Sequence, residues 1–212
     1  RGGFNMTAST TAAVVYPSPN TDGIYPVSYF PEIAGDYTLS VMLRRSGGLL
    51  AWYYPFEDLL EPRDGDHLHC IESMAFCDST RTDANIDFTW GNDSPLSDAS
   101  IVLDDVFPHN FFSVRWWGHV RGPVTGSVTF HVAGDHGFRL WIDGTMVIDA
   151  WSIDAEEVTG SVPMVAGVLS EIRAEYREQL GNAEVHLSWS GPGLQKAIVP
   201  SSALYHTRHL EG

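Results

Sequence analysis

Apolar and polar residues alternate along the middle of the chain, between positions 126 and 151. A period of two is the pattern of a β-strand with one buried face, and residues that favour tight turns interrupt it twice. The second interruption contains Asp143-Gly144, which predicts a two-residue hairpin turn. The pattern therefore predicts three antiparallel strands, over 128–132, 138–142 and 147–151.

The residues of these strands also form a family signature. Residues 130–151 read F-x-V-x-x-D-x-G-x-R-L-W-I-D-G-x-x-V-I-D-x-W. This pattern resembles the central signature of the PA-14 domain, a β-sandwich named after the protective antigen of a bacterial toxin and shared with yeast flocculin lectins and adhesins. Other segments similar to this family follow one another in the family's order: 49–54, 86–91, 112–118, 159–162, 172–176, 187–190 and 198–205.

The resemblance implies an all-β fold with a PA-14-type antiparallel β-sandwich over 47–206 and a polar tail over 207–212. Residues 1–46 carry a second resemblance. Their phrase D-G-x-Y-x-V-x-Y-x-P…A-G-x-Y-x-L-x-V is similar to the second half of a filamin-type immunoglobulin-like repeat. We therefore expect N-terminal immunoglobulin-like strands, a hinge at Ser46-Gly47-Gly48, and a long loop over 55–85, which lacks periodicity.

The composition is that of a folded globular protein, with 43% hydrophobic and 18% charged residues. The net charge is −15, and Lys196 is the single lysine, which argues against nucleic acid as a partner because phosphate binding requires a cationic patch. No apolar run approaches the roughly 20 residues that a membrane-spanning helix needs. The chain opens abruptly without a signal peptide, so we expect it to be part of a longer protein.

Two cysteines, Cys70 and Cys77, are close enough in sequence to close a small loop. A disulfide there would stabilise the fold by roughly 2–3 kcal/mol by restricting the unfolded chain. The alternative is a zinc site with His67 and His69, although the C-x-x-C pairing of structural zinc sites is missing. A disulfide, together with a glycosylation sequon at Asn5, favours an extracellular or cell-surface location.

A candidate ligand site lies at the first turn of the signature. In sugar-binding PA-14 domains this turn carries two adjacent aspartates, joined by a cis peptide, that hold a calcium ion against vicinal sugar hydroxyls. Asp135 matches the first aspartate, and His136 replaces the second. Imidazole is a poor ligand for calcium, which prefers oxygen. Two alternatives therefore stay open: Asp135 holds calcium without a second carboxylate, or the pair only shapes the turn.

The opposite loop of the family's site corresponds to Gln179, Gly181 and Asn182, which offer amide and backbone oxygens. Trp151 is a further candidate because an aromatic ring can stack on a sugar face. The chain contains no G-x-S-x-G, H-E-x-x-H or phosphate-binding glycine loop, and hence no motif for catalysis.

Three functions agree with these observations. The first is a non-enzymatic carbohydrate-binding or adhesion module of a larger surface protein, with glycans as partners. The second is a structural assembly module that contacts neighbouring protein domains or subunits and binds no small ligand. The third is an accessory domain of a glycoside hydrolase, for which the chain lacks a recognisable pair of catalytic carboxylates.

Overall fold

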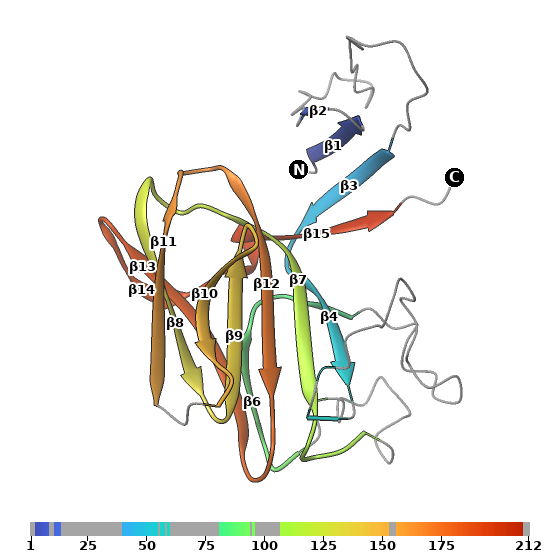
Figure 1. Ribbon diagram of the computed structural model, residues 1–212, viewed down its shortest axis with the longest axis vertical. Helices are drawn as coiled ribbons and strands as arrows, with labels where there is room; N and C mark the ends of the chain where they lie inside the picture. The colour runs from blue at the N-terminus through green and yellow to red at the C-terminus, as the bar shows by residue number, and fades with distance from the viewer. Residues whose placement is uncertain are drawn as a thin grey trace.

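The computed structural model describes residues 3–8, 11–13, 40–54, 56, 57, 59, 81–93, 95, 107–152 and 156–209, and side chains within 44–207 of these ranges. Two antiparallel sheets face each other in a β-sandwich (Figure 1). Within the described ranges, the short 3-10 helix η1 (Ser201–Ala203) is the only helical segment, and no helix is long and apolar enough to cross a membrane. The predicted all-β fold is confirmed.

The larger sheet has ten strands, which run in the order β10-β9-β12-β7-β15-β3-β1-β2, with β4 and β5 added beside β7. Long strands occupy its centre, and β12 pairs with β7 over nine residues. The strands are β1 (Gly3–Ala8), β2 (Thr11–Ala13), β3 (Ser40–Ser46), β4 (Leu49–Tyr54), β5 (Arg81–Asp83), β7 (Ser113–Arg121), β9 (Gly137–Ile142), β10 (Thr145–Ala150), β12 (Leu169–Arg177) and β15 (Leu204–His209).

This sheet forks at β7, because two strands share the edge of β7 that faces away from β12. β4 pairs with the first half of β7, whereas Leu204 and Tyr205 of β15 pair with its second half. Gly118 lies at the fork, where a Cβ atom would come within 2.2 Å of the Tyr205 carbonyl oxygen. A glycine is therefore required for the two strands to diverge here.

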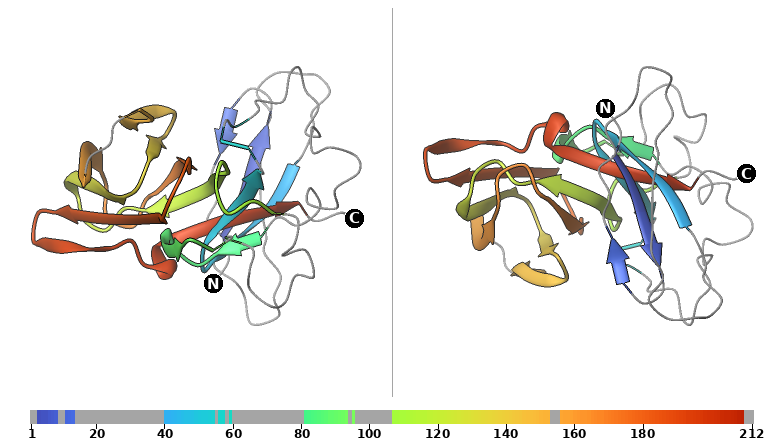
Figure 2. Two further views of the ribbon diagram at one scale, coloured as in Figure 1. Left: turned by 90° about the horizontal axis from the view of Figure 1, so that it is seen from below. Right: turned by 90° about the horizontal axis from the view of Figure 1, so that it is seen from above.

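The smaller sheet has five strands in the order β11-β8-β13-β14, with β6 paired to β13. Its strands are β6 (Asp87–Gly91), β8 (Gly126–Gly134), β11 (Glu157–Met164), β13 (Ala183–Gly191) and β14 (Leu194–Ile198). Figure 2 shows the β13–β14 hairpin projecting on the side of the molecule opposite β1–β3.

The core lies between the sheets and follows the period of two. Val128 and Phe130 of β8 and Leu140 of β9 are fully buried, as the alternation predicted. The turn between β9 and β10 has positive φ at Asp143 (47°) and Gly144 (74°), which is the geometry of a two-residue hairpin turn. This turn is therefore as predicted.

Three expectations differ from the structure. The predicted loop over 55–85 contains strand β5, because Arg81 to Asp83 pair with β4. The predicted tail over 207–212 begins inside β15, which continues to His209. The sheet also continues across the predicted hinge, since β3 before it pairs with β15 after it. Strand pairing to distant residues decides all three, and local sequence contains no signal for it. The pair Cys70 and Cys77 lies outside the described residues.

Candidate functional site

One end of the sandwich carries a pocket of about 270 Å³. Three segments meet there: the β8–β9 turn, the end of β10, and the turn that follows β12. The lining residues are Asp135, His136, Gly137, Trp151, Ser152, Arg177 and Gln179. The pocket therefore gathers an aromatic ring, both signs of charge and an amide in one place.

The β8–β9 turn places Asp135 and His136 on the pocket wall. The Asp135 amide donates to the Glu184 carbonyl oxygen at 3.0 Å, which fixes the turn against β13. His136 has a φ of 62°, and the peptide bond that joins it to Asp135 is trans. Asp135 Oδ1 accepts the His136 amide hydrogen at 3.2 Å. The side chain of Asp135 thus helps to hold the turn, and 40% of it is exposed to the pocket and solvent.

A buried carboxylate lies behind His136. Glu178 is fully buried, and its Oε2 lies 3.2 Å from His136 Nδ1 and accepts the Tyr176 hydroxyl at 2.6 Å. Its second oxygen, Oε1, has no hydrogen-bond partner among the described residues. Burial raises the pKa of Glu178 from its ordinary value of 4.5, although Tyr176 and His136 oppose this shift. Burial and the contact with Glu178 raise the pKa of Tyr176.

This environment predicts opposite outcomes for two substitutions. Glu178→Gln should leave the free energy of unfolding at pH 8 equal to or above that of the native chain, because it removes a buried charge and keeps an acceptor for Tyr176. Glu178→Ala should lower it by roughly 1–3 kcal/mol, because the buried hydroxyl loses its partner.

The pH dependence follows from the raised pKa of Glu178. Between its ordinary and raised values the folded state binds more protons than the unfolded state, so this group adds stability as the pH falls. Glu178→Gln lacks that contribution, and its advantage should shrink when urea unfolding is repeated from pH 8 down to pH 4. Equal losses in the Gln and Ala variants at pH 8 would contradict this account.

Trp151 forms the aromatic wall of the pocket and lies against two guanidinium groups. The Arg139 guanidinium carbon is 4.0 Å from the ring centroid, and that of Arg177 is 5.1 Å away. Arg177 also packs over Gly137, where a Cβ atom would come within 2.8 Å of Arg177 Nε. These contacts hold the indole and the Arg177 guanidinium in fixed positions.

The structure brings together four of the six residues predicted for the ligand site. Asp135, His136, Trp151 and Gln179 line the pocket, whereas Gly181 and the exposed Asn182 do not. The Gln179 side chain donates to Glu57 at 3.0 Å, and the Gly181 amide donates to Asn110, so this loop is held by neighbouring loops.

Sequence reasoning missed Arg177. The period of two in β12 could have identified it, because that period places Arg173, Glu175 and Arg177 on one face of the strand.

The pocket does not match a calcium site of the two-aspartate kind. No group of three or more His, Cys, Asp or Glu side chains in the described part of the chain is arranged to hold a metal ion. Asp135 contributes one carboxylate, His136 offers nitrogen, and calcium takes six to eight oxygen ligands. Calcium binding stays a prediction.

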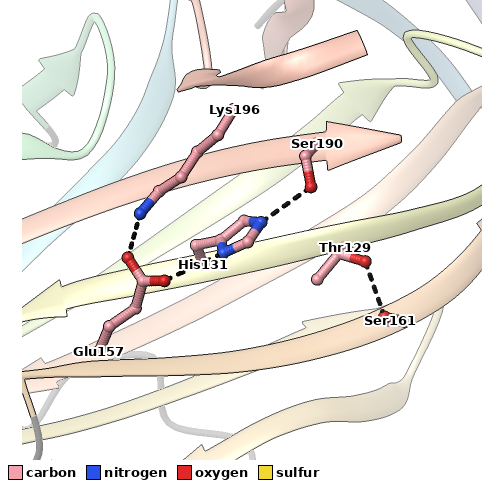
Figure 3. Close-up of polar contacts among 6 residues, drawn as sticks. All are labelled: Thr129, His131, Glu157, Ser161, Ser190 and Lys196. Carbon is pink, nitrogen blue, oxygen red and sulfur yellow. Dashed lines mark hydrogen bonds and ion pairs between the residues drawn. The ribbon is translucent and has the colours of Figure 1, made fainter. Parts of the chain in front are cut away.

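A second polar cluster covers the outer face of the smaller sheet (Figure 3). His131 Nε2 lies 2.8 Å from Ser190 Oγ, and His131 Nδ1 lies 3.2 Å from Glu157 Oε1, an order that resembles a catalytic triad. Lys196 also contacts Glu157, and this hydrogen bond lowers the pKa of Glu157.

This cluster joins side chains from four neighbouring strands of the smaller sheet. His131 lies on β8, whose backbone pairs with β11 on one side and β13 on the other. We interpret the cluster as a set of cross-strand contacts that stabilise the sheet.

Comparison with known proteins agrees with this architecture. A model of the PA14 domain matches residues 45–203. The anti-sigma-I factor RsgI3 of Acetivibrio thermocellus is 40% identical over 126 residues, which are 59% of this chain and 18% of that protein. This chain thus spans less than a fifth of that relative. The match gives no support for a filamin-type repeat before residue 45, and that resemblance stays a prediction.

Solved structures show the same fold. An anti-sigma factor domain-containing protein from Clostridium clariflavum is 27% identical with a TM-score of 0.60, covering 93% of this chain and 57% of that one. A PA14 sugar-binding domain from an RTX adhesin is 20% identical with a TM-score of 0.52, covering 76% of this chain and 99% of that one.

Proposed function

The chain belongs to the PA14 domain family, and from this premise we propose that it is a non-enzymatic carbohydrate-binding module of a larger extracellular or cell-surface protein. The observation that carries the proposal is the pocket beside Trp151, which combines an aromatic ring with Asp135, Arg177 and Gln179. One finding on another protein supports it: the chain shares its fold with a PA14 sugar-binding domain from an RTX adhesin.

The side chains of the pocket suit a sugar. A pyranose ring presents C–H groups on its faces and hydroxyls around its edge, so it needs an apolar platform and several donors and acceptors. Trp151 supplies the platform, Asp135 accepts hydrogen bonds, and Arg177 donates them. Gln179 adds an amide at the rim, although it also donates to Glu57. Recognition of this kind requires no metal ion.

The similarity to anti-sigma factors favours a specific use of such binding. An anti-sigma factor binds a sigma factor, and a separate domain of the same protein can respond to a ligand. This chain is 40% identical to RsgI3 over 126 residues, and we therefore propose that glycan binding serves sensing or adhesion in the parent protein. An assembly role without a ligand is the alternative, and the same experiment distinguishes the two.

A glycan array tests the proposal directly. We expect saturable binding that persists in a chelator and disappears in Trp151→Ala. Gln179→Ala should weaken binding by about tenfold, the equivalent of one hydrogen bond of about 1.4 kcal/mol. Asn182→Ala is the matched control, because it removes the same amide from an exposed position outside the pocket and should bind normally.

Each other outcome has a definite meaning. Binding that requires calcium and Asp135 would restore the two-aspartate type of mechanism with His136 tolerated. Loss of binding in Asn182→Ala but not in Trp151→Ala would place the ligand elsewhere. If no glycan binds with or without calcium, the sugar-binding proposal is wrong and the assembly role replaces it.

A further inference from the structure

The outer face of the larger sheet carries a group of arginines on an acidic protein. The chain carries a net charge of −15 with 12 lysine and arginine residues. Five of the arginines lie on the neighbouring strands β7, β9 and β12, where the period of two points them away from the core. They are Arg115, Arg121, Arg139, Arg173 and Arg177.

Tryptophan rings separate these arginines. The Arg173 guanidinium carbon is 3.9 Å from the Trp141 centroid, and that of Arg139 is 5.5 Å from the same ring. Arg139 in turn lies 4.0 Å from Trp151, which also contacts Arg177. We call these five residues, Trp141, Trp151, Arg139, Arg173 and Arg177, the Arg–Trp ladder. It ends in the pocket, because Trp151 and Arg177 also line that pocket.

Two arginines of this face share one buried carboxylate. Glu175 is 1% exposed and pairs with Arg139 at 2.7 Å and with Arg115 at 2.8 Å, so it serves two cations. Arg173 is more distant from it, at 3.9 Å. Arg177 Nε is buried without a hydrogen-bond partner among the described residues. Asp149 opposite Arg139 on β10, Glu171 on the same face of β12 and Asp135 in the adjoining pocket are further acids near these arginines.

We propose that the Arg–Trp ladder and the adjoining pocket bind an acidic polysaccharide, a sugar chain that bears carboxylate or sulfate groups. This rests on the proposed function and names its ligand class. A planar guanidinium matches carboxylate and sulfate oxygens in a two-pronged geometry. Fixed arginines on the protein thus supply the positive charge for the ligand.

The overall negative charge does not oppose this at physiological salt. The Debye length is then about 8 Å, so a bound chain feels the local arginines more strongly than distant acidic residues. The contacts are partly exposed to solvent, and the binding should therefore weaken strongly at 1 M salt, where the Debye length is about 3 Å. A neutral glycan would show little salt dependence.

The test uses the whole chain and four probes: polygalacturonate, heparin, neutral dextran and poly-glutamate. Binding is measured by calorimetry at 0.15 M and 1 M salt for the native chain and for Arg173→Gln combined with Arg177→Gln. These two positions are chosen because neither closely pairs with the buried Glu175. Arg121→Gln is the matched control, since Arg121 also stacks on an aromatic ring, Tyr205, at the opposite end of β7. Thermal melts confirm that each variant folds.

We expect at least a tenfold loss of affinity for an acidic polysaccharide in the double variant and no loss in Arg121→Gln. Preference for polygalacturonate over heparin, or the reverse, identifies carboxylate or sulfate as the recognised group. Neutral dextran binding that needs Trp151 and ignores the arginines would overturn this inference and leave the proposed function intact. Equal binding of poly-glutamate would also overturn it, in favour of an acidic protein partner. If neither acidic polysaccharide binds, this inference is wrong, and the glycan array decides the proposed function separately.

Discussion

Replacing Asp83 by alanine should lower the free energy of unfolding by about 3–5 kcal/mol, the typical cost of breaking a buried ion pair from one side. Asp83 is 3% exposed on β5. It accepts the Tyr53 hydroxyl at 2.7 Å and the Trp116 indole N–H at 2.7 Å, and it pairs with Arg81 at 2.6 Å. The variant leaves the first two donors inside the protein without an acceptor.

The protonation of Tyr53 depends on the same buried carboxylate. Burial and the nearby Asp83 carboxylate raise the pKa of Tyr53 well above its usual range, so its hydroxyl stays protonated and donates to Asp83. Asp83→Asn keeps one acceptor oxygen, and we expect it to lose less stability than Asp83→Ala. The loss should appear as a lower urea midpoint with an unchanged slope.

Asp87→Ala is the matched control. Asp87 also lies on a strand, and its Oδ1 is 2.6 Å from His186 Nδ1, but its side chain is 40% exposed. Exposed pairs contribute roughly 0–1 kcal/mol, so this variant should unfold close to the native chain. If the two alanine variants have equal stability, burial is not the cause of the effect at Asp83.

Sequence reasoning could predict the strands but not all of their partners. Alternation identified the strands around Phe130 and Leu140, because a buried face repeats every second residue whatever the strand pairs with. Strand β5 has three residues, too few to show a period, and it forms because β4 pairs with it. The role of Asp83 was missed for this reason, since its partners come from β4 and β7.

The candidate site was predictable to a similar extent. The family signature led to Asp135, His136 and Trp151, because their positions in the turn and strand follow the pattern. The Arg–Trp ladder was not predicted, since it depends on the register that sets Arg173 beside Trp141 across two strands. Spacing within one strand contains no information on that register.

Glu175→Ala should also lower the free energy of unfolding by about 3–5 kcal/mol. The side chain is buried on the outer face of β12, beneath Arg115 and Arg139, whose guanidinium groups pair with it. Without the carboxylate, like charges remain close together and lose their acceptor. Glu171→Ala is the control. Glu171 lies four residues earlier on the same face of β12, but its side chain is exposed, so this variant should change the free energy of unfolding little.

A triple variant separates the ion pairs from the packing they provide. Substituting Glu175→Leu together with Arg115→Met and Arg139→Met removes all three charges and keeps similar volumes. Replacing a whole buried ion cluster by apolar residues is often neutral or stabilising by roughly 1–4 kcal/mol, so this variant should recover most of the stability that Glu175→Ala loses. It also removes Arg139 from the Arg–Trp ladder. We therefore expect a folded protein that binds acidic sugar chains more weakly. This result would show that the three charges contribute more to ligand binding than to the stability of the fold. A triple variant that unfolds as easily as Glu175→Ala would show the opposite.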